Sequence, residues 1–165
     1  MSLELRTILC CVAMAPTSER VLLQALHEAK VHDARIHVLH ILPSYDATMA
    51  VPIVSFMGEE KFRQLVEEHK GETEETIRGE IGRIGKRIRT EHLDEDVDRI
   101  VDVHVYEGDP VLEILNMAGR LDAGMIVMGT HTKGLTEHTF MGSVARKVLK
   151  RARVPVLLVP PVAGT

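Results

Sequence analysis

Five short apolar segments alternate with four stretches of helical pattern along this chain, and this alternation constrains the fold more than any other feature. The expected strands are residues 7–13, 35–42, 100–106, 125–128 and 154–159, and the expected helices are residues 17–32, 59–91, 110–121 and 139–152. Strands that alternate with helices form a parallel sheet, because right-handed crossover connections place the helices on its faces. The sequence therefore predicts an α/β fold, a doubly wound five-stranded parallel sheet with helices on both faces.

Length and composition agree with a single core. The chain has 165 residues, the size of one ordinary domain, so we expect one domain over residues 1–165. Aromatic residues make up 3% of the chain, and it contains eight methionines and no tryptophan. The core must therefore consist mainly of Ile, Val, Leu and Met, which suits strands that are buried on both faces.

Charge and hydropathy argue against two classes of partner. A formal net charge of -4 leaves no general excess of cations for a phosphate backbone, so nucleic acid is not expected as the main partner. No segment reaches the roughly 18 consecutive apolar residues that a membrane span needs. Residues 1–6 lack the basic segment and apolar core of a secretory signal. We therefore expect a cytoplasmic protein with no membrane span.

Cysteine and histidine positions give no sign of a metal or a disulfide. Cys10 and Cys11 are adjacent within an apolar segment, where a disulfide between neighbours would be strained, so they are interpreted as small buried side chains. The nine histidines form no recognised ligand motif, and His37 and His40 point to opposite faces of a strand. No structural metal is expected.

The longest expected helix carries the strongest periodic signal. Ile77, Ile81, Ile84 and Ile88 are spaced four, three and four residues apart, which marks one apolar face. This segment also contains several glycines, and glycine disfavours helices. The helix is therefore expected either to break near Gly71 or to pack closely against a neighbour there.

Two other helices have recognisable starts. Asp109 and Pro110 provide an N-cap followed by proline at the first helical position. Thr17 or Ser18 can cap the first helix in the same way.

Ligands of open parallel sheets bind beyond the carboxyl ends of the strands, which directs attention to the loops that follow them. The loop after the fourth strand contains Gly129, and Gly142 and Ser143 stand near the start of the last helix. Free N–H groups at a helix start accept an anion, and glycine lets a phosphate approach the backbone. The alternative is structural, with Gly129 as a turn and Gly142 as a close packing point.

Two better-known phosphate loops do not fit this sequence. Gly129 and Gly134 have the spacing of a Walker A loop, but Leu135 and Thr136 stand where lysine and a hydroxyl residue are required. A dinucleotide-binding turn needs glycines directly after the first strand, and residues 13–16 contain none.

The chain resembles the universal stress proteins, whose nucleotide-binding members carry G-x2-G-x9-G-[ST] between the fourth strand and the last helix. Gly129, Gly142 and Ser143 match this motif. The resemblance extends over nearly the whole chain and includes I-L-C-C-V, H-V-L-H-I, E-G-D-P, I-V-M-G-T-H and G-S-V-A-R-K-V-L.

The resemblance implies a strand order of 3-2-1-4-5 and a homodimer formed through the last edge strand, residues 154–160. It implies ATP or AMP as ligand, alone or with Mg²⁺. Ile41 and Met128 would lie by the base, and Cys11, Val12 and Ala13 along the base and ribose. The residues expected near the phosphates are Gly129, Thr130, His131, Thr132, Gly142, Ser143 and Val144.

Two positions depart from the family pattern. Thr132 replaces the second motif glycine, and Ala13 replaces the aspartate that usually ends the first strand. The first hypothesis is an adenine-nucleotide-binding regulatory module, not a strong catalyst. The departures motivate a second, a nucleotide-free dimer that acts in interaction or stress protection. A third is a weak ATPase or phosphotransfer enzyme that uses His131.

Residues 43–58 form a long apolar connection in this interpretation. Connections of this length are often functional lids, so a flap over the nucleotide or a dimer contact is favoured. An extension of the core beneath the long helix is the alternative.

Overall fold

The computed structural model describes residues 4–15, 17–42, 44, 47–130 and 141–161. Its centre is a five-stranded sheet in which all pairs are parallel and the strand order is β3-β2-β1-β4-β5. The strands are β1 (Thr7–Cys11), β2 (Arg35–Leu42), β3 (Ile100–Glu107), β4 (Met125–Gly129) and β5 (Val156–Val159). Both the doubly wound fold class and the strand order are therefore confirmed.

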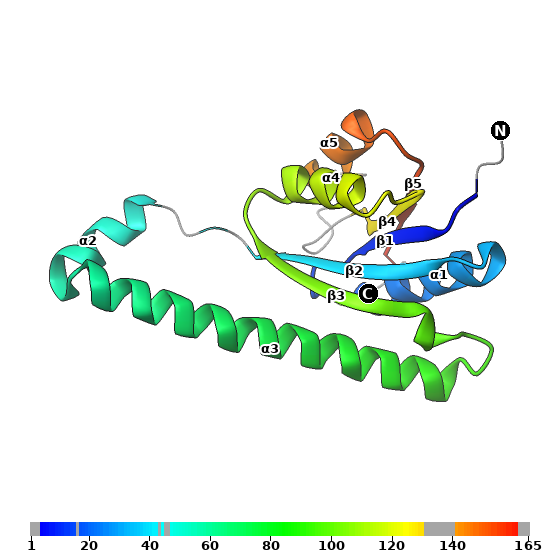
Figure 1. The fold of residues 1–165 in the computed structure, drawn as a ribbon, viewed down its shortest axis with the longest axis horizontal. Coiled ribbons are helices and arrows are strands. Elements are labelled where there is room, and N and C mark those ends of the chain that lie inside the picture. The colour runs from blue at the N-terminus through cyan, green and yellow to red at the C-terminus, as the bar shows by residue number, and fades with distance from the viewer. Residues whose placement is uncertain (1–3, 16, 43, 45–46, 131–140, 162–165) are drawn as a thin grey trace.

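Helices cover both faces of the sheet (Figure 1). They are α1 (Ser18–His32), α2 (Ala47–Met57), α3 (Glu59–Glu91), α4 (Pro110–Arg120) and α5 (Ser143–Arg151), with a short 3-10 helix, η1 (Val97–Arg99), before β3. One apolar core lies between the sheet and helices α1 and α3, and a second lies under α4 and α5. Successive β1 residues alternate between them, with Ile8 and Cys10 in the first core and Leu9 in the second.

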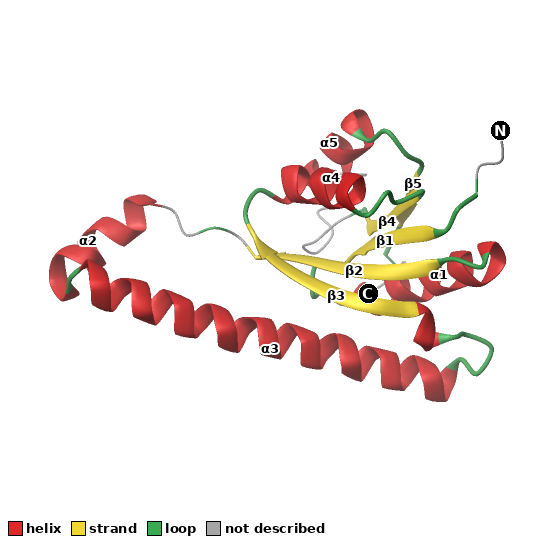
Figure 2. Cartoon of the chain, in the orientation of Figure 1, coloured by secondary structure: helices red, strands yellow, loops and turns green. Residues whose placement is uncertain are grey.

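Helix α3 is continuous, so the glycines do not break it (Figure 2). Its buried stripe contains Ile77, Ile81, Ile84 and Ile88, as the spacing predicts. A Cβ at Gly71 would meet no atom within 4 Å, whereas one at Gly85 would lie 3.3 Å from Val97 Cγ1. Close packing therefore occurs at Gly85, and not at Gly71.

The segment expected to be a long connection contains helix α2, which is the main difference from the predicted elements. Pro52 lies inside α2, and proline disfavours the interior of a helix, so the local sequence gives little sign of helix here. The helix packs against α3, and Gly58, with a φ of 87°, makes the turn between them. Together with the first half of α3 it projects beyond the sheet (Figure 1).

Helix starts follow the sequence in one case and differ in another. Asp109 Oδ1 accepts a hydrogen bond of 2.9 Å from the Leu112 N–H, which confirms the predicted cap of α4. Thr17 is the N-cap of α1 but makes no side-chain capping bond. Ser18 Oγ instead accepts a hydrogen bond of 3.0 Å from the Ala15 N–H.

Two strand boundaries differ from the prediction by two residues. Strand β1 ends at Cys11, two residues earlier than expected, and β5 begins at Val156, two residues later. Helix α5 begins at Ser143 with Gly142 as its N-cap, which confirms the position expected for this pair. The expected start of that helix at residue 139 lies outside the described residues.

Candidate functional site

A cavity of about 610 Å³ lies where strands β1 and β4 end side by side. The chain passes from β1 outward to β2 and β3 and then returns to β4, so this is the point where the winding direction reverses. The residues that line the cavity come from the strand ends and from four helices: Cys11, Val12, Ala13, Met14, Thr17, Ser18, Val21, Leu39, His40, Ile41, Leu42, Thr73, Ile77, Pro110, Ile114, Met128, Gly129 and Val144.

The cavity brings together residues that the sequence analysis proposed from separate segments. Seven of them line it: Cys11, Val12, Ala13, Ile41, Met128, Gly129 and Val144. Met128 is buried, whereas Ala13 is exposed. The seven residues lie at the ends of three neighbouring strands and in the first turn of α5.

Three more proposed residues frame the loop that follows β4. The Thr130 N–H donates to the Val159 carbonyl over 3.2 Å, and the Gly142 N–H donates to the Thr130 carbonyl over 2.7 Å. Ser143, which is exposed, begins α5. These contacts hold the start of α5 against the end of β4. His131 and Thr132 lie outside the described residues.

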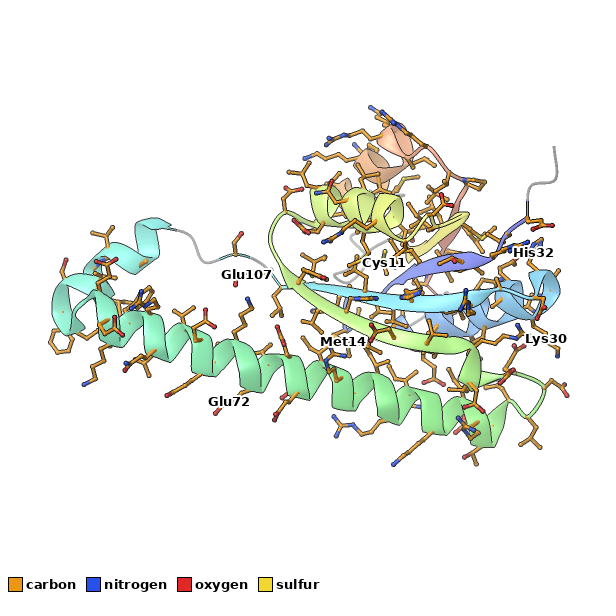
Figure 3. The ribbon with its side chains drawn as sticks, viewed as in Figure 1. Cys11, Met14, Lys30, His32, Glu72 and Glu107 are labelled. Atoms are coloured by element: carbon orange, nitrogen blue, oxygen red, sulfur yellow. The ribbon has the colours of Figure 1, made fainter. Side chains whose placement is uncertain are left out.

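The turn after β1 is made without glycine. Met14 has a φ of 52°, the left-handed region that residues other than glycine rarely adopt. Cys11 packs against the core under α4 and α5, whereas Met14 packs against the core under α1 and α3 (Figure 3). Side chains of this short segment therefore reach both faces of the sheet beside the cavity.

His40 is a cavity residue that the sequence analysis did not assign to the site. Its ring is buried, and its Nδ1 lies 2.8 Å from the Val12 carbonyl oxygen. Because a carbonyl only accepts, Nδ1 carries a proton, and in a neutral ring Nε2 then has the lone pair. The sequence signal for His40 as a site residue is its position near the carboxyl end of a predicted strand. Its spacing from His37 bears only on metal binding.

The cavity wall offers little charge of its own. Among the described lining residues, the ionisable side chains are Cys11 and His40. Burial raises the pKa of the Cys11 thiol well above its usual value, with the adjacent Cys10 as a second cause, so the thiol is neutral. An anionic ligand would therefore depend on main-chain N–H groups and on the positive end of α5.

A second cavity of about 480 Å³ adjoins the first along Met14 and Ile77. It lies between α1 and α3, and Glu19 and Arg87 at its edge form an ion pair with an N–O distance of 2.7 Å. Helix α3 thus contributes to both cavities. None of the described residues of α2 lines either one.

The family model for the universal stress protein family matches residues 4–160. The chain belongs to the universal stress protein family. A universal stress protein from Thermus aquaticus is 30% identical to this chain over 154 residues, which are 93% of this chain and 98% of the relative.

Solved universal stress proteins share its fold. The protein UspA from Lactobacillus plantarum superposes with a TM-score of 0.68 at 15% identity, covering 94% of this chain and 98% of that one. A universal stress protein solved in complex with cAMP superposes with a TM-score of 0.53 at 16% identity, covering 95% of this chain and 98% of that one. Within the described part of this universal stress protein, no helix is long and apolar enough to cross a membrane.

Proposed function

We propose that this universal stress protein binds an adenine nucleotide, ATP or AMP, and acts as a regulatory module through binding and not through turnover. The observation that carries the proposal is the cavity at the end of β1 and β4, which gathers seven of the proposed nucleotide residues. Its volume lies within the range of about 300–1,000 Å³ that is common for ligand pockets. A nucleotide complex of a protein with the same fold supports the choice of ligand class.

The base would lie between apolar side chains. Ile41 and Met128 stand at the ends of β2 and β4, on the α4 and α5 side of the sheet. The described cavity lining contains no aromatic ring apart from the imidazole of His40, so the base would be held by aliphatic contacts and by that histidine. The Nε2 lone pair of His40 can accept a hydrogen bond from an exocyclic amine or a ribose hydroxyl.

The phosphates would lie at the start of α5. The first N–H groups of a helix have no partners within it, and the helix dipole favours negative charge there. In α5 these groups belong to Ser143, Val144 and Ala145, with Gly142 before them. Thr130, His131 and Thr132 belong to the same proposed phosphate loop, of which the last two lie outside the described residues.

Ala13 affects how a bound cation would be coordinated. Its methyl group lines the cavity where a carboxylate would otherwise be available, so Mg²⁺ would be held by the phosphates of ATP without this carboxylate. An Ala13→Asp variant is therefore expected to bind MgATP more tightly than the wild type, while AMP binding changes little.

Calorimetric titration of nucleotide-free protein with ATP and AMP tests the proposal. Val144→Glu places a carboxylate in the first turn of α5, where it repels phosphate, and should weaken ATP binding at least about tenfold. Val31→Glu is the matched control, because Val31 is 63% exposed near the end of α1, and its variant should bind as the wild type does.

Two results would contradict this function. The first is the absence of both co-purifying nucleotide and measurable heat on titration, which would favour the alternative of a nucleotide-free interaction protein. The second is unchanged ATP affinity in Val144→Glu, which would mean that the phosphates do not bind at the start of α5. Measurable ATP hydrolysis that His131→Ala abolishes would instead favour the enzymatic alternative.

We also propose that the protein forms a homodimer through β5. This strand lies at the edge of the sheet, so one side of its backbone has no partner strand among the residues that the structure describes. An apolar edge strand favours pairing with another copy.

A further inference from the structure

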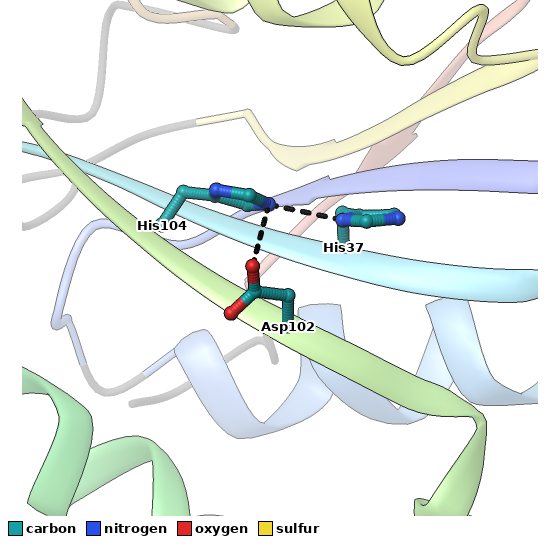
Figure 4. A group of neighbouring side chains, drawn as sticks. All are labelled: His37, Asp102 and His104. Carbon is teal, nitrogen blue, oxygen red and sulfur yellow. Dashed lines mark hydrogen bonds and ion pairs between the residues drawn. The ribbon is translucent and has the colours of Figure 1, made fainter.

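Two histidines and an aspartate gather on one face of the sheet, away from the nucleotide cavity. His37 lies on β2, and Asp102 and His104 lie on the neighbouring edge strand β3 (Figure 4). Asp102 is paired directly with His37, and His104 follows two residues later on the same face. None of the three lines either cavity.

An irregularity in the strand pairing creates this arrangement. The register between β2 and β3 shifts between Ile36 and His37, so that Ile36 pairs with Ile100 while His37 pairs with Asp102. Val101 is thereby left without a partner in β2, as at a β-bulge. Without the shift, Asp102 and His104 would lie on the face opposite His37.

The donor atoms lie at separations that suit one metal ion. His37 Nδ1 is 2.9 Å from His104 Nε2, and His104 Nε2 is 3.7 Å from Asp102 Oδ2. All three donors lie within 4.8 Å of one another. Two metal–ligand bonds of roughly 2.1 Å at a tetrahedral angle separate their donors by about 3.4 Å, a value between the two measured distances.

The three side chains are only partly covered by their surroundings. Helix α4 lies over β1 and β2, and the side chains of His104 and Asp102 are 17% and 55% exposed. Arg35, two residues before His37, adds a positive charge that opposes cation binding, whereas Asp102 adds a negative charge that favours it. Partial burial, with His104 as the next cause, lowers the pKa of His37 and so favours its neutral ring.

We propose that His37, His104 and Asp102 form a site for Zn²⁺ or a similar divalent transition-metal ion. Imidazole nitrogens and a carboxylate oxygen are a ligand set that zinc accepts, and a water molecule would complete a four-coordinate ion. In the metal-free protein one proton lies between His37 Nδ1 and His104 Nε2, because at least one ring nitrogen must donate in their hydrogen bond. The ion takes the position of that proton, which moves to the other nitrogen of the ring that donated it, so both rings stay neutral.

A second group of potential ligands, Glu19, Glu91 and His92, is less suitable. The Glu19 carboxylate already pairs with the Arg87 guanidinium over 2.7 Å, so a metal would have to compete with that ion pair. The histidine and aspartate group contains two nitrogen donors already in contact, and its members belong to two hydrogen-bonded strands.

The test is a calorimetric titration of untagged, chelator-treated protein with ZnCl₂. The wild type should bind one equivalent. His37→Gln and His104→Gln should each weaken that binding at least about tenfold, since loss of even an outer contact of a metal site costs 10–100-fold. Glutamine keeps a polar side chain at these partly exposed positions, and circular dichroism verifies that each variant remains folded.

His69→Gln is the matched control, because His69 is exposed on α3 and should leave the affinity unchanged. Nitrogen NMR of the histidine rings gives a second readout, in which Zn²⁺ should shift Nδ1 of His37 and Nε2 of His104. The proposal is overturned if the wild type binds no Zn²⁺, or if the His37→Gln, His104→Gln double variant binds it as tightly as the wild type. Equal losses in His69→Gln would also overturn it.

Discussion

Gly108 occupies the turn between β3 and α4, at the edge of the sheet that carries the candidate site. Its φ of 151° lies in the region that favours glycine, and its N–H donates to the Leu42 carbonyl over 3.1 Å. A Cβ at this position would also lie 3.2 Å from Glu113 Cγ. Backbone conformation and space therefore both favour glycine here.

Gly108→Ala should lower the free energy of unfolding by about 1–3 kcal/mol, the cost of holding a residue with a Cβ in a rarely populated conformation. Urea denaturation measures the change. Gly119→Ala is the contrasting control, since Gly119 lies in α4 with no atom within 4 Å of an added Cβ. That variant should be about 0.5–1 kcal/mol more stable than the wild type, and equal effects of the two substitutions would contradict the argument.

At the scale of single residues, sequence reasoning located the cavity residues better than the histidine contacts. Met128 and Gly129 were identifiable because they lie at the end of an apolar strand, and the carboxyl end of a parallel strand is where ligands bind. The contact between His37 and His104 was not identifiable, because the two residues are 67 positions apart and meet only through a shifted strand register.

Helix α3 has two halves with different surroundings. The buried residues of the helix extend from Ile77 to Ile88 and pack against the sheet, whereas Leu65 in the first half is 46% exposed. The first half projects with α2, where Val51 and Phe56 are 64% and 92% exposed. The same helix therefore joins the core at one end and presents a partly apolar surface at the other.

The two halves should respond differently to truncation of an apolar side chain. Ile88 is fully buried, so Ile88→Ala should lower the free energy of unfolding by about 2–5 kcal/mol through lost burial and the cavity left behind. Leu65→Ala should change it by less than about 0.5 kcal/mol. Urea denaturation of both variants decides the point, and a large loss in Leu65→Ala would mean that the projecting half is also packed.

Most elements follow from local signals, and α2 shows where these signals fail. The stripe of isoleucines identified α3, and the Asp109 cap with Pro110 identified the start of α4, because both depend on residues within a few positions of one another. Helix α2 contains Pro52 and gains its contacts from α3. Local helix propensity is therefore low in α2, and packing against α3 stabilises the helix.

At the scale of the whole molecule, the outermost strands of the sheet in the described residues are β3 and β5. The carbonyls of Pro155 and Val159 accept hydrogen bonds from Ile126 and Thr130 of the β4 side. Since alternate residues of a parallel strand bond to opposite sides, Val156 directs its N–H toward the open edge. This donor is available to a second copy of the chain.

Val156→Pro removes that donor and leaves the bonds to β4 in place, because proline is tolerated at an edge where the N–H faces outward. If β5 forms the proposed dimer, light scattering should give the mass of two chains for the wild type and of one chain for this variant. Val156→Ala keeps the N–H and should remain dimeric. A monomeric wild type, or a dimeric Val156→Pro, would contradict pairing through β5.

The sequence by itself determined the alternation of strands and helices, the aliphatic character of the core and the place of Gly142 and Ser143 at the start of the last helix, and its resemblance to a known family supplied the strand order. These properties depend on periodicity, composition and short motifs, which are local. The single core that composition predicts is divided by the sheet into two. Only the tertiary structure decided that Ala47–Met57 form a helix, that His40 binds the Val12 carbonyl, and that His37 lies beside His104 and Asp102. Those contacts join segments distant in the chain, and packing and strand register, which no local pattern contains, bring them together.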